Sequence, residues 1–221
     1  TLAIALKTLN QMYKGGIFDH IGGGFSRYST DKKWLVPHFE KMLYDNALLT
    51  ISYLEAYQIT NDNLFLSVAE RTLDFVLSEL TDESGGFYSA LDADSEGVEG
   101  KYYVFTPSEI INLLGEDDGE YFNKYYDITE EGNFEGKNIP NLITNPNIDS
   151  NNRINGLSLK VLKYRSERTF LHRDDKILTS WNALMIVAFI KAFKATQNKK
   201  YLVNAQKAFS FIKNNRYDCF R

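Results

Sequence analysis

Two segments of the sequence repeat each other without a gap, at a constant offset of 136 residues. The matched positions carry the same or similar side chains: Asn46 and Asn182, Ala56 and Ala192, Tyr57 and Phe193, Thr60 and Thr196, Phe65 and Tyr201, Leu66 and Leu202, Ala69 and Ala205, and Phe75 and Phe211. In both segments apolar residues recur at helical spacing around a short polar turn, which predicts a helical hairpin. Repeating hairpins must stack to bury their second faces, so the repeat favours a stacked helical architecture.

Apolar spacing and turn signals predict the remaining elements. Helices are expected at 1–14, 37–58, 66–80, 106–114, 120–126, 157–170, 178–197 and 199–214. Aromatic runs at 87–91 and 101–105, around an acidic turn, predict an inserted β-hairpin near residues 86–105. We therefore predict an all-α fold, with one partial domain over 1–221. Its hairpins form either an open solenoid or, as we favour, part of a closed α/α toroid.

Local signals refine the middle of the chain. Thr106 as N-cap and Glu109 three residues later predict a capping box at the start of a short helix. Residues 127–155 are rich in Asn, Gly and Pro and lack periodicity, which predicts a long loop. Gly-Gly pairs follow the helices that end at residues 14 and 80, so glycine-rich loops would emerge at a common end of the stacked hairpins.

Composition restricts the partners. The net charge is −4 and the Lys and Arg residues do not cluster, so we expect no nucleic-acid surface. No apolar run reaches the roughly 18 residues that a membrane-spanning helix needs. The single Cys219 excludes an internal disulfide and a multi-cysteine zinc site, is expected to be inert, and is consistent with a reducing, cytoplasmic location. Both ends of the chain look truncated, so the missing signal peptide is uninformative. The sequence leaves the oligomeric state open.

Residues 15–46 combine five glycines with two histidines and several aromatic side chains, a density typical of a functional segment. Within its glycine-rich loop, His20, Arg27 and Tyr28 offer an ionisable group, a fork of donors and a stacking ring. This set suits a polyhydroxylated or carboxylated ligand. The alternative is that these side chains hold the loop together by structural hydrogen bonds.

His38 and Asp45 are candidate catalytic residues in the second half of this segment. Pro37 suits the first turn of a helix, so the two side chains would project from one helical face about 10 Å apart along the axis. A histidine near the positive helix start favours its neutral form, which suits a general base. The alternative is that His38 packs beside the loop and that Asp45 satisfies a buried amide.

An acidic cluster lies in the predicted β-hairpin. Asp92, Asp94 and Glu96 alternate, so an extended strand would place them on one face, for acid–base chemistry or for a cation. The run DADSEG imitates the opening of a calcium loop but has Tyr103 where the twelfth position needs a bidentate Glu. The three histidines lack metal-ligand spacing as well, so we expect no metal and no cofactor.

A third candidate segment precedes and opens the later hairpin. It contains Asp175, Trp181 and Asn182, with Asp174 and His172 nearby. A tryptophan beside carboxylates commonly stacks on a sugar ring, although Trp181 at a helix start can equally belong to the core. We predict that the segments holding His38, the Asp92 cluster and Asp175 meet around one pocket.

Four runs in this order resemble the spermatogenesis-associated family of thioredoxin-domain-containing proteins: GGIFDHIGGGFSRYSTDKKWLVPHFEKMLYDNALL, GGFYSALDADSEGVEGKYYVF, GNFEGKNIPNL and DDKILTSWNALMI. The resemblance implies an (α/α)6 toroid similar to N-acylglucosamine 2-epimerases and six-hairpin glycosidases, of which this chain covers part. It also implies a thioredoxin-like domain outside this chain, which contains no CxxC motif. Ser26 stands where we expect a family histidine, Phe105 where we expect Trp, and Ala183 where we expect Gly. The first change weakens the case for a proton carrier on the glycine loop.

The resemblance implies a carbohydrate-handling pocket more firmly than it implies a reaction, because a fold does not fix a function. The leading hypothesis is an epimerase-like or glycosidase-like pocket for a small-molecule carbohydrate. Its catalytic candidates are His38, Asp45, Asp92, Asp94 and Asp175, and its substrate-binding candidates are His20, Arg27, Tyr28, Trp181 and Asn182. The alternative is a non-catalytic binding or scaffold module in which the same polar residues hold the loops.

Overall fold

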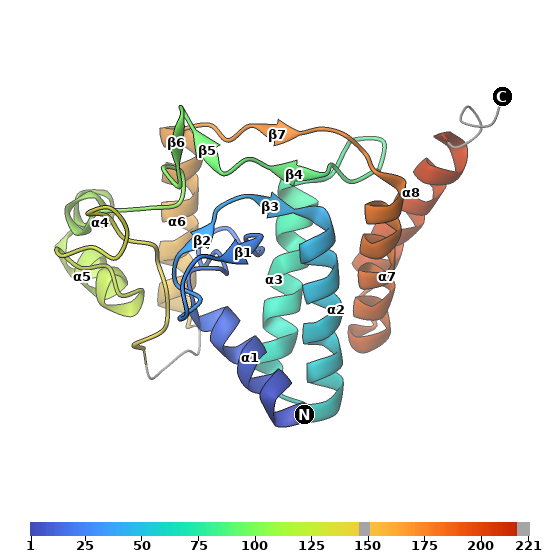
Figure 1. Cartoon of the computed structure of the whole chain (residues 1–221), viewed down its shortest axis with the longest axis horizontal. Helices are drawn as coiled ribbons and strands as arrows, with labels where there is room; N and C mark the ends of the chain where they lie inside the picture. The colour runs from blue at the N-terminus through green and yellow to red at the C-terminus, as the bar shows by residue number, and fades with distance from the viewer. Residues whose placement is uncertain (146–150, 216–221) are drawn as a thin grey trace. The chain divides into compact units, whose positions relative to one another are not determined.

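The structure, a computed structural model, describes residues 1–145 and 151–215, and Cys219 lies outside this part. Its helices (Figure 1) are α1 (Leu2–Lys14), α2 (Leu43–Thr60), α3 (Asn63–Glu79), α4 (Pro107–Leu114), α5 (Glu116–Tyr125), α6 (Asn152–Arg168), α7 (Thr179–Thr196) and α8 (Lys199–Asn215). Short strands connect them: β1 (Tyr28–Ser29), β2 (Pro37–His38), β3 (Lys41–Met42), β4 (Ala90–Leu91), β5 (Asp94–Ser95), β6 (Val98–Glu99) and β7 (Arg173–Asp174).

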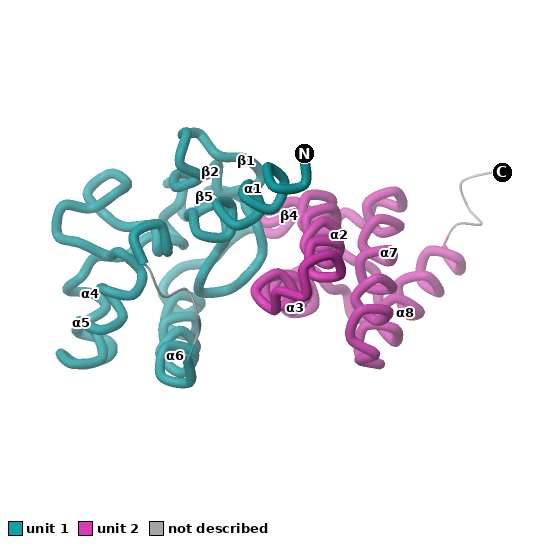
Figure 2. The backbone as a smooth tube through the Cα atoms, turned by 90° about the horizontal axis from the view of Figure 1, so that it is seen from below, with its two compact units in different colours: residues 1–40, 92–172 teal, residues 41–91, 173–221 magenta. Residues whose placement is uncertain are grey.

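The chain divides into two compact units, coloured separately in Figure 2. Unit 1 takes residues 1–40 and 92–172, and unit 2 takes residues 41–91 and those from 173 onward. The strands pair inside the units: β1 with β2 and β5 with β6 in unit 1, and β3, β4 and β7 as a three-stranded sheet in unit 2. Each unit is therefore described by itself, and the single domain expected over 1–221 stays a prediction.

Unit 2 is built from the repeated hairpins, α2–α3 and α7–α8. All four helix boundaries of the first hairpin recur in the second at the offset of 136 residues. The turns match too, because Asn61 and its counterpart Gln197 both adopt left-handed backbone angles, with φ of 55° and 58°. The next residues, Asp62 and Asn198, each accept a backbone N–H two positions on, at 2.9 and 3.0 Å. The structure therefore confirms the internal repeat as two copies of one hairpin.

Unit 1 holds α1, the glycine-rich loop, the β5–β6 hairpin, and helices α4 to α6. Its buried core is aromatic and includes Phe18, Phe25, Phe39, Phe105 and Phe122. The predicted capping box at the start of α4 is confirmed, because the Thr106 hydroxyl accepts the Glu109 N–H while the Glu109 carboxylate accepts the Thr106 N–H. Two of the four backbone N–H groups that a helix start leaves unbonded are thereby satisfied.

The structure corrects the predicted start of the second helix. We expected this helix from Pro37, but α2 begins at Leu43, and Met42 before it is extended, with φ of −98° and ψ of 141°. Strand pairing is the reason, because Pro37–His38 pairs with β1, and β3 pairs with β4. These ladders satisfy the backbone in place of helical bonds. His38 and Asp45 therefore do not share a helical face.

The inserted β-hairpin lies within the predicted range, but with different strands. Asp94–Ser95 and Val98–Glu99 pair around a two-residue turn, and the predicted run at 101–105 forms turns and an isolated bridge instead. Both turn residues, Glu96 and Gly97, have positive φ, 54° and 76°. A type I′ turn requires this geometry, which glycine adopts without steric cost. The predicted all-α class, with helical hairpins and a small inserted β-hairpin, is confirmed.

Among the helices at 1–145 and 151–215, none is long and apolar enough to cross a membrane.

Candidate functional site

The glycine-rich loop of unit 1 is packed around His20, which is 1% exposed. Its Nε2 lies 3.2 Å from the carbonyl oxygen of Gly15, and its ring meets Tyr13 and Phe18 edge-on, with centroids 5.3 Å away in both cases. These contacts give His20 a structural role in packing the loop. We therefore leave this predicted substrate-binding residue out of the candidate site.

A buried ion pair fastens the same loop to α6. Asp19 receives two bonds from Arg165, both of 2.9 Å, and its Oδ1 also accepts the N–H groups of Ile21 and Gly22. Burial lowers the pKa of the Arg165 guanidinium, but the Asp19 carboxylate outweighs that effect and raises it above its ordinary value. Arg165 therefore stays charged, and the pair serves to fix the loop.

A second group in unit 1, made of ionisable side chains and one tyrosine, is partly accessible. We name it the His38 cluster, consisting of Arg27, Tyr28, His38, Glu40, Asp94 and Glu99. His38 Nδ1 lies 2.8 Å from Glu99 Oε1, and Nε2 lies 3.7 Å from Glu40 Oε2. Arg27 holds the same Glu40 oxygen at 3.0 Å. The His38 side chain is 29% exposed, so small molecules can reach the ring.

Strand register explains why these side chains gather. Tyr28 pairs with His38 across β1 and β2, so their rings stack with centroids 5.1 Å apart. Asp94 pairs with Glu99 across β5 and β6. Directly opposed residues of an antiparallel pair share one face, with Cβ atoms about 4.5–5.5 Å apart. The register therefore puts Asp94 beside the carboxylate that holds His38.

The β5–β6 hairpin is anchored by a buried serine. Ser95 is 1% exposed; its hydroxyl lies 2.7 Å from the Thr169 hydroxyl and donates to the carbonyl oxygen of Phe170 at 2.6 Å. Both partners directly follow α6, whose last residue is Arg168. The end of α6 thus fixes the hairpin that presents Glu99.

The alternation predicted for the acidic run is observed. Asp92, Asp94 and Glu96 are exposed, and the residues between them are buried. Glu96 pairs with Lys101, which holds the pKa of its carboxyl below the usual range, and Asp92 accepts the Asp94 N–H at 3.4 Å. Within residues 1–145 and 151–215, no group of three or more potential ligands could hold a metal ion.

The remaining predicted residues, Asp45, Asp175, Trp181 and Asn182, lie in unit 2. Asp175 is exposed on the segment that leads into α7. Asp45 lies in the first turn of α2, where a carboxylate is favoured. Trp181 is half-buried and meets Tyr44 edge-on, with ring centroids 4.8 Å apart. Whether Asp45 and Asp175 join His38 in one pocket stays a prediction.

Asn182 has a structural explanation within unit 2. Its amide is fully buried, accepts the Phe87 N–H at 2.8 Å, and donates to the carbonyl oxygens of Phe87 and Leu178 at 2.9 and 3.0 Å. These bonds fix the loop after α3 against α7. We leave Asn182 out of the candidate site for that reason.

Sequence reasoning missed three residues that shape unit 1: Glu40, Glu99 and Arg165. Glu99 had a usable signal, because a two-residue turn at Glu96-Gly97 sets the register that pairs Asp94 with Glu99. Glu40 follows His38 by two residues, but its role depends on strand geometry that a helical interpretation hides. Arg165 lies 146 positions from Asp19, and no local pattern connects them.

Comparison with known proteins identifies relatives that align with nearly the whole chain. No family model matches the sequence. Spermatogenesis-associated protein 20 of Mus musculus is 36% identical over 250 residues, covering 97% of this chain and 32% of the mouse protein. The Homo sapiens protein of that name is 35% identical over 252 residues, with the same two coverages. The chain is a homologue of one region of these proteins. The resemblance to the spermatogenesis-associated family is thereby confirmed.

The homologous region spans about a third of the length of these curated relatives, 32% in the mouse protein. Among solved structures, a crystal structure of a D-mannose isomerase is similar to this spermatogenesis-associated protein homologue, with a TM-score of 0.39 and 18% identity. That alignment covers 94% of this chain and 50% of the isomerase. Because the TM-score is this low, the closure of the hairpins into a toroid stays a prediction.

Proposed function

We propose that the His38 cluster binds a carbohydrate or a similar polyol and that His38 transfers a proton to or from it. One observation carries this proposal: an accessible imidazole with a carboxylate, Glu99, 2.8 Å from its Nδ1. A carboxylate on one ring nitrogen fixes the tautomer and the orientation of the ring. The other nitrogen, Nε2, is then the atom that takes up or gives a proton.

The rest of the cluster suits a hydroxyl-rich ligand. Tyr28 is 50% exposed and offers a flat ring on which a sugar can stack. Arg27 supplies a fork of donors, and the carboxylates of Glu40 and Asp94 accept hydrogen bonds from hydroxyl groups. A neutral polyol can therefore satisfy the same donors and acceptors that bind each other in its absence.

This arrangement favours epimerase-like or isomerase-like proton transfer over glycoside hydrolysis. In such a reaction His38 Nε2 removes the proton from the carbon beside a carbonyl; the electron pair of that C–H bond forms a C=C bond and the carbonyl π pair moves to oxygen, which gives an enediolate. A proton returned to carbon from the His38 imidazolium or from solvent re-forms the carbonyl and gives the product. Hydrolysis would instead need two carboxyl groups flanking the bond, whereas two of the three carboxylates in the cluster, Glu99 and Glu40, are paired with His38 and Arg27. Asp92, Asp45, Asp175 and Trp181 stay proposed catalytic or substrate-binding residues.

The test is solvent exchange on the intact gene product. Free mono- and disaccharides are incubated in D2O, and deuterium at the carbon beside the carbonyl is measured by NMR. We expect exchange with at least one sugar, abolished in His38→Gln and at least about tenfold slower in Glu99→Gln. The matched control is His172→Gln, which changes another exposed histidine of unit 1 and should leave exchange intact.

A second candidate function is a non-catalytic binding or scaffold module. It is favoured by the mutual pairing of the charges, since Arg27 holds Glu40 and His38 holds Glu99. Sugar-induced thermal shifts separate the two. Shifts that disappear in Arg27→Gln while no sugar exchanges deuterium would favour a binding module. Absence of both shifts and exchange with every sugar would overturn the carbohydrate proposal.

A further inference from the structure

The repeat allows burial to be compared position by position between the two hairpins of unit 2. In α2, one stripe at helical spacing is almost completely buried: Leu43, Ala47, Thr50 and Leu54, each at most 1% exposed. The counterparts in α7 are Thr179, Ala183, Ile186 and Ile190, of which three are exposed and Ile186 is half-buried. Among residues 1–145 and 151–215, the same stripe is therefore covered in the first hairpin and largely exposed in the second.

The second helices of the hairpins show the same contrast. Leu73 of α3 is 0% exposed, whereas its counterpart in α8, Phe209, is 59% exposed. Val76 is likewise fully buried, and its counterpart Ile212 is half-buried. A single exposed apolar side chain is ordinary, but Phe209 adds to the exposed α7 stripe on the same hairpin, and such a group of apolar side chains is typical of an interaction surface.

α7 packs along α2 (Figure 1), with Tyr44 of α2 meeting Trp181 of α7 and Glu55 of α2 binding Lys191 of α7, and we attribute the burial of the α2 stripe to this neighbour. On α7, Met185 and Ala188 are completely buried, whereas their α2 counterparts Leu49 and Ser52 are half-buried and exposed. These two positions lie on the opposite side of the helix from the 179–190 stripe, at about 100° per residue. α7 thus meets α2 with one side and presents the equivalent of the α2 stripe on the other.

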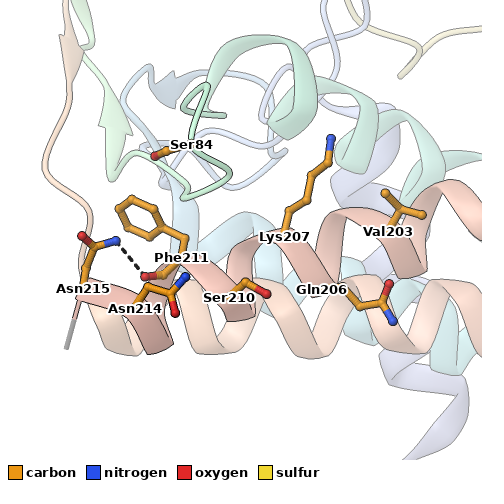
Figure 3. Close-up of a pocket in the computed structure, with 8 residues that line it drawn as sticks. All are labelled: Ser84, Val203, Gln206, Lys207, Ser210, Phe211, Asn214 and Asn215. Atoms are coloured by element: carbon orange, nitrogen blue, oxygen red, sulfur yellow. Dashed lines mark hydrogen bonds between the residues drawn. The ribbon is translucent and has the colours of Figure 1, made fainter. Parts of the chain in front are cut away.

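Polar side chains also differ between the two hairpins: those of α3 have partners on α8, and their counterparts on α8 line a groove. Glu70 and Asp74 of α3 bind the start of α8, accepting the Tyr201 hydroxyl at 3.2 Å and the Lys200 ammonium at 2.5 Å. The counterparts of these two acids on α8 are Gln206 and Ser210. Figure 3 shows both lining an open groove, whose other walls include Val203, 45% exposed.

We infer that this surface of the α7–α8 hairpin, here named the far face, docks a third helical hairpin of the same repeat. The far face comprises Thr179, Ala183, Ile186, Ile190, Gln206, Phe209, Ser210 and Ile212. It continues the established α2–α7 interface by one more step of the repeat. The expected source is the remainder of the gene product, because this chain matches only 32% of the length of its mouse relative.

The repeat specifies the chemistry of the occupant. Its first helix lays small and aliphatic side chains, like Met185 and Ala188, along the Ala183–Ile190 stripe. Its second helix begins with a polar or cationic residue and an aromatic hydroxyl, as in Lys200-Tyr201, which reach Ser210 and Gln206. Such a step, repeated, is also what a closed toroid requires. The inference is independent of the proposed carbohydrate chemistry.

Cysteine accessibility tests the inference in a Cys219→Ser background. Three single variants are labelled with a thiol reagent, in the 221-residue chain and in the intact gene product. Ala183→Cys probes the far face, Ala47→Cys is the matched buried position, and Lys199→Cys is an exposed control whose counterpart, Asn63, is exposed next to a docked hairpin. In the 221-residue chain, Ala183→Cys should label at least about 100-fold faster than Ala47→Cys.

In the intact gene product, Ala183→Cys should slow toward the rate of Ala47→Cys, while Lys199→Cys keeps its rate. Unchanged fast labelling of Ala183→Cys there would overturn the inference. So would protection of Ala183→Cys in the 221-residue chain that rises with protein concentration, because a second copy would then be the occupant. Circular dichroism of each variant confirms that the helices are retained.

Discussion

Two of the assemblies of opposite charges in unit 1 differ mainly in their access to water. The Asp19 and Arg165 side chains are 6% and 3% exposed, whereas those of Arg27, His38, Glu40 and Glu99 range from 26% to 47%. Both assemblies attach the glycine-rich segment to another part of the unit. The two assemblies contain similar types of residue and differ in burial. The buried pair therefore has a structural role, and the partly exposed cluster is the candidate site.

The physical reason is desolvation. In the interior, Asp19 must have its charge matched by Arg165 and backbone N–H groups, so exchanging these partners for a ligand would be costly. At the surface, water replaces a lost partner of His38 or Glu40 at little cost. The His38 cluster can therefore exchange internal bonds for bonds to a ligand, whereas the Asp19–Arg165 pair cannot.

Removing one member of the buried pair should have the largest effect. Arg165→Met leaves the Asp19 carboxylate buried without its counter-charge and should lower the free energy of unfolding by about 3–5 kcal/mol. Urea unfolding followed by circular dichroism measures this. The double variant Asp19→Leu/Arg165→Met should recover much of the loss. If Arg165→Met lowered the free energy of unfolding by less than about 1 kcal/mol, the ion pair would not be what holds the glycine-rich loop to α6.

Crowding the same pair should have an intermediate effect. A Cβ added at Gly22 would lie 2.2 Å from Arg165 Nη2, so Gly22→Ala should destabilise unit 1 by about 1–3 kcal/mol. The matched control is Gly156→Ala in α6, where a Cβ meets no atom within 4 Å and Ala is the better helix former. That variant should stabilise by about 0.5–1 kcal/mol. Equal effects of the two substitutions would contradict the packing argument.

Asp31, in the connection between β1 and β2, is less buried than Asp19, and its contribution to stability should depend on pH. Burial raises the pKa of its carboxyl, but hydrogen bonds from the Leu35, Lys33 and Val36 N–H groups and the Ser29 hydroxyl outweigh this and leave it below the ordinary value. The folded state therefore favours the carboxylate. The stability this provides is present above the unfolded pKa of about 4 and is lost as pH falls through the lower, folded value.

Asp31→Asn should accordingly make the free energy of unfolding depend less on pH at acidic pH. The measurement is urea unfolding at a series of pH values from about 6 down to 2, compared with the unsubstituted protein. A stronger dependence on pH in the variant would contradict the sign of the shift.

The smallest effect on stability is expected in the His38 cluster. Glu99→Gln should change the free energy of unfolding by no more than about 0.5 kcal/mol, because the Glu99 side chain is 47% exposed and that of its partner His38 is 29% exposed, so water can replace the lost contact. The same substitution should still slow deuterium exchange at least about tenfold, because it removes the carboxylate that orients the His38 ring. A loss of stability comparable to that of Arg165→Met would remove the contrast between the two assemblies.

The helical part of the fold was predictable because its signals are local. The bounds of α7 and α8 agree with the predicted ranges to within a residue, and the capping box at Thr106 and Glu109 was readable from four positions. The start of α2 was predicted wrongly because β3 pairs with β4, whose residues lie 49 positions further along the chain. Propensity at Pro37 cannot compete with such a long-range ladder.

The candidate site was predictable in part. His38, Arg27, Tyr28 and Asp94 were chosen for their chemistry, and strand register gathers them in unit 1. What the sequence could not provide was the burial that removes His20 and Asn182 from consideration, because burial depends on segments distant along the chain. Their side chains look as reactive in the sequence as that of His38.

The anchoring of the β5–β6 hairpin by Ser95 has an evolutionary consequence. The hairpin holds Glu99 against His38 while being fastened to the residues after α6, so its reach depends on a turn of two residues and one buried hydroxyl. Changes in turn length or in Thr169 would move the carboxylate without replacing any ligand-facing side chain. Substitutions at these anchoring residues would thus alter the surroundings of His38 while the imidazole and its stacking partner, Tyr28, stay constant.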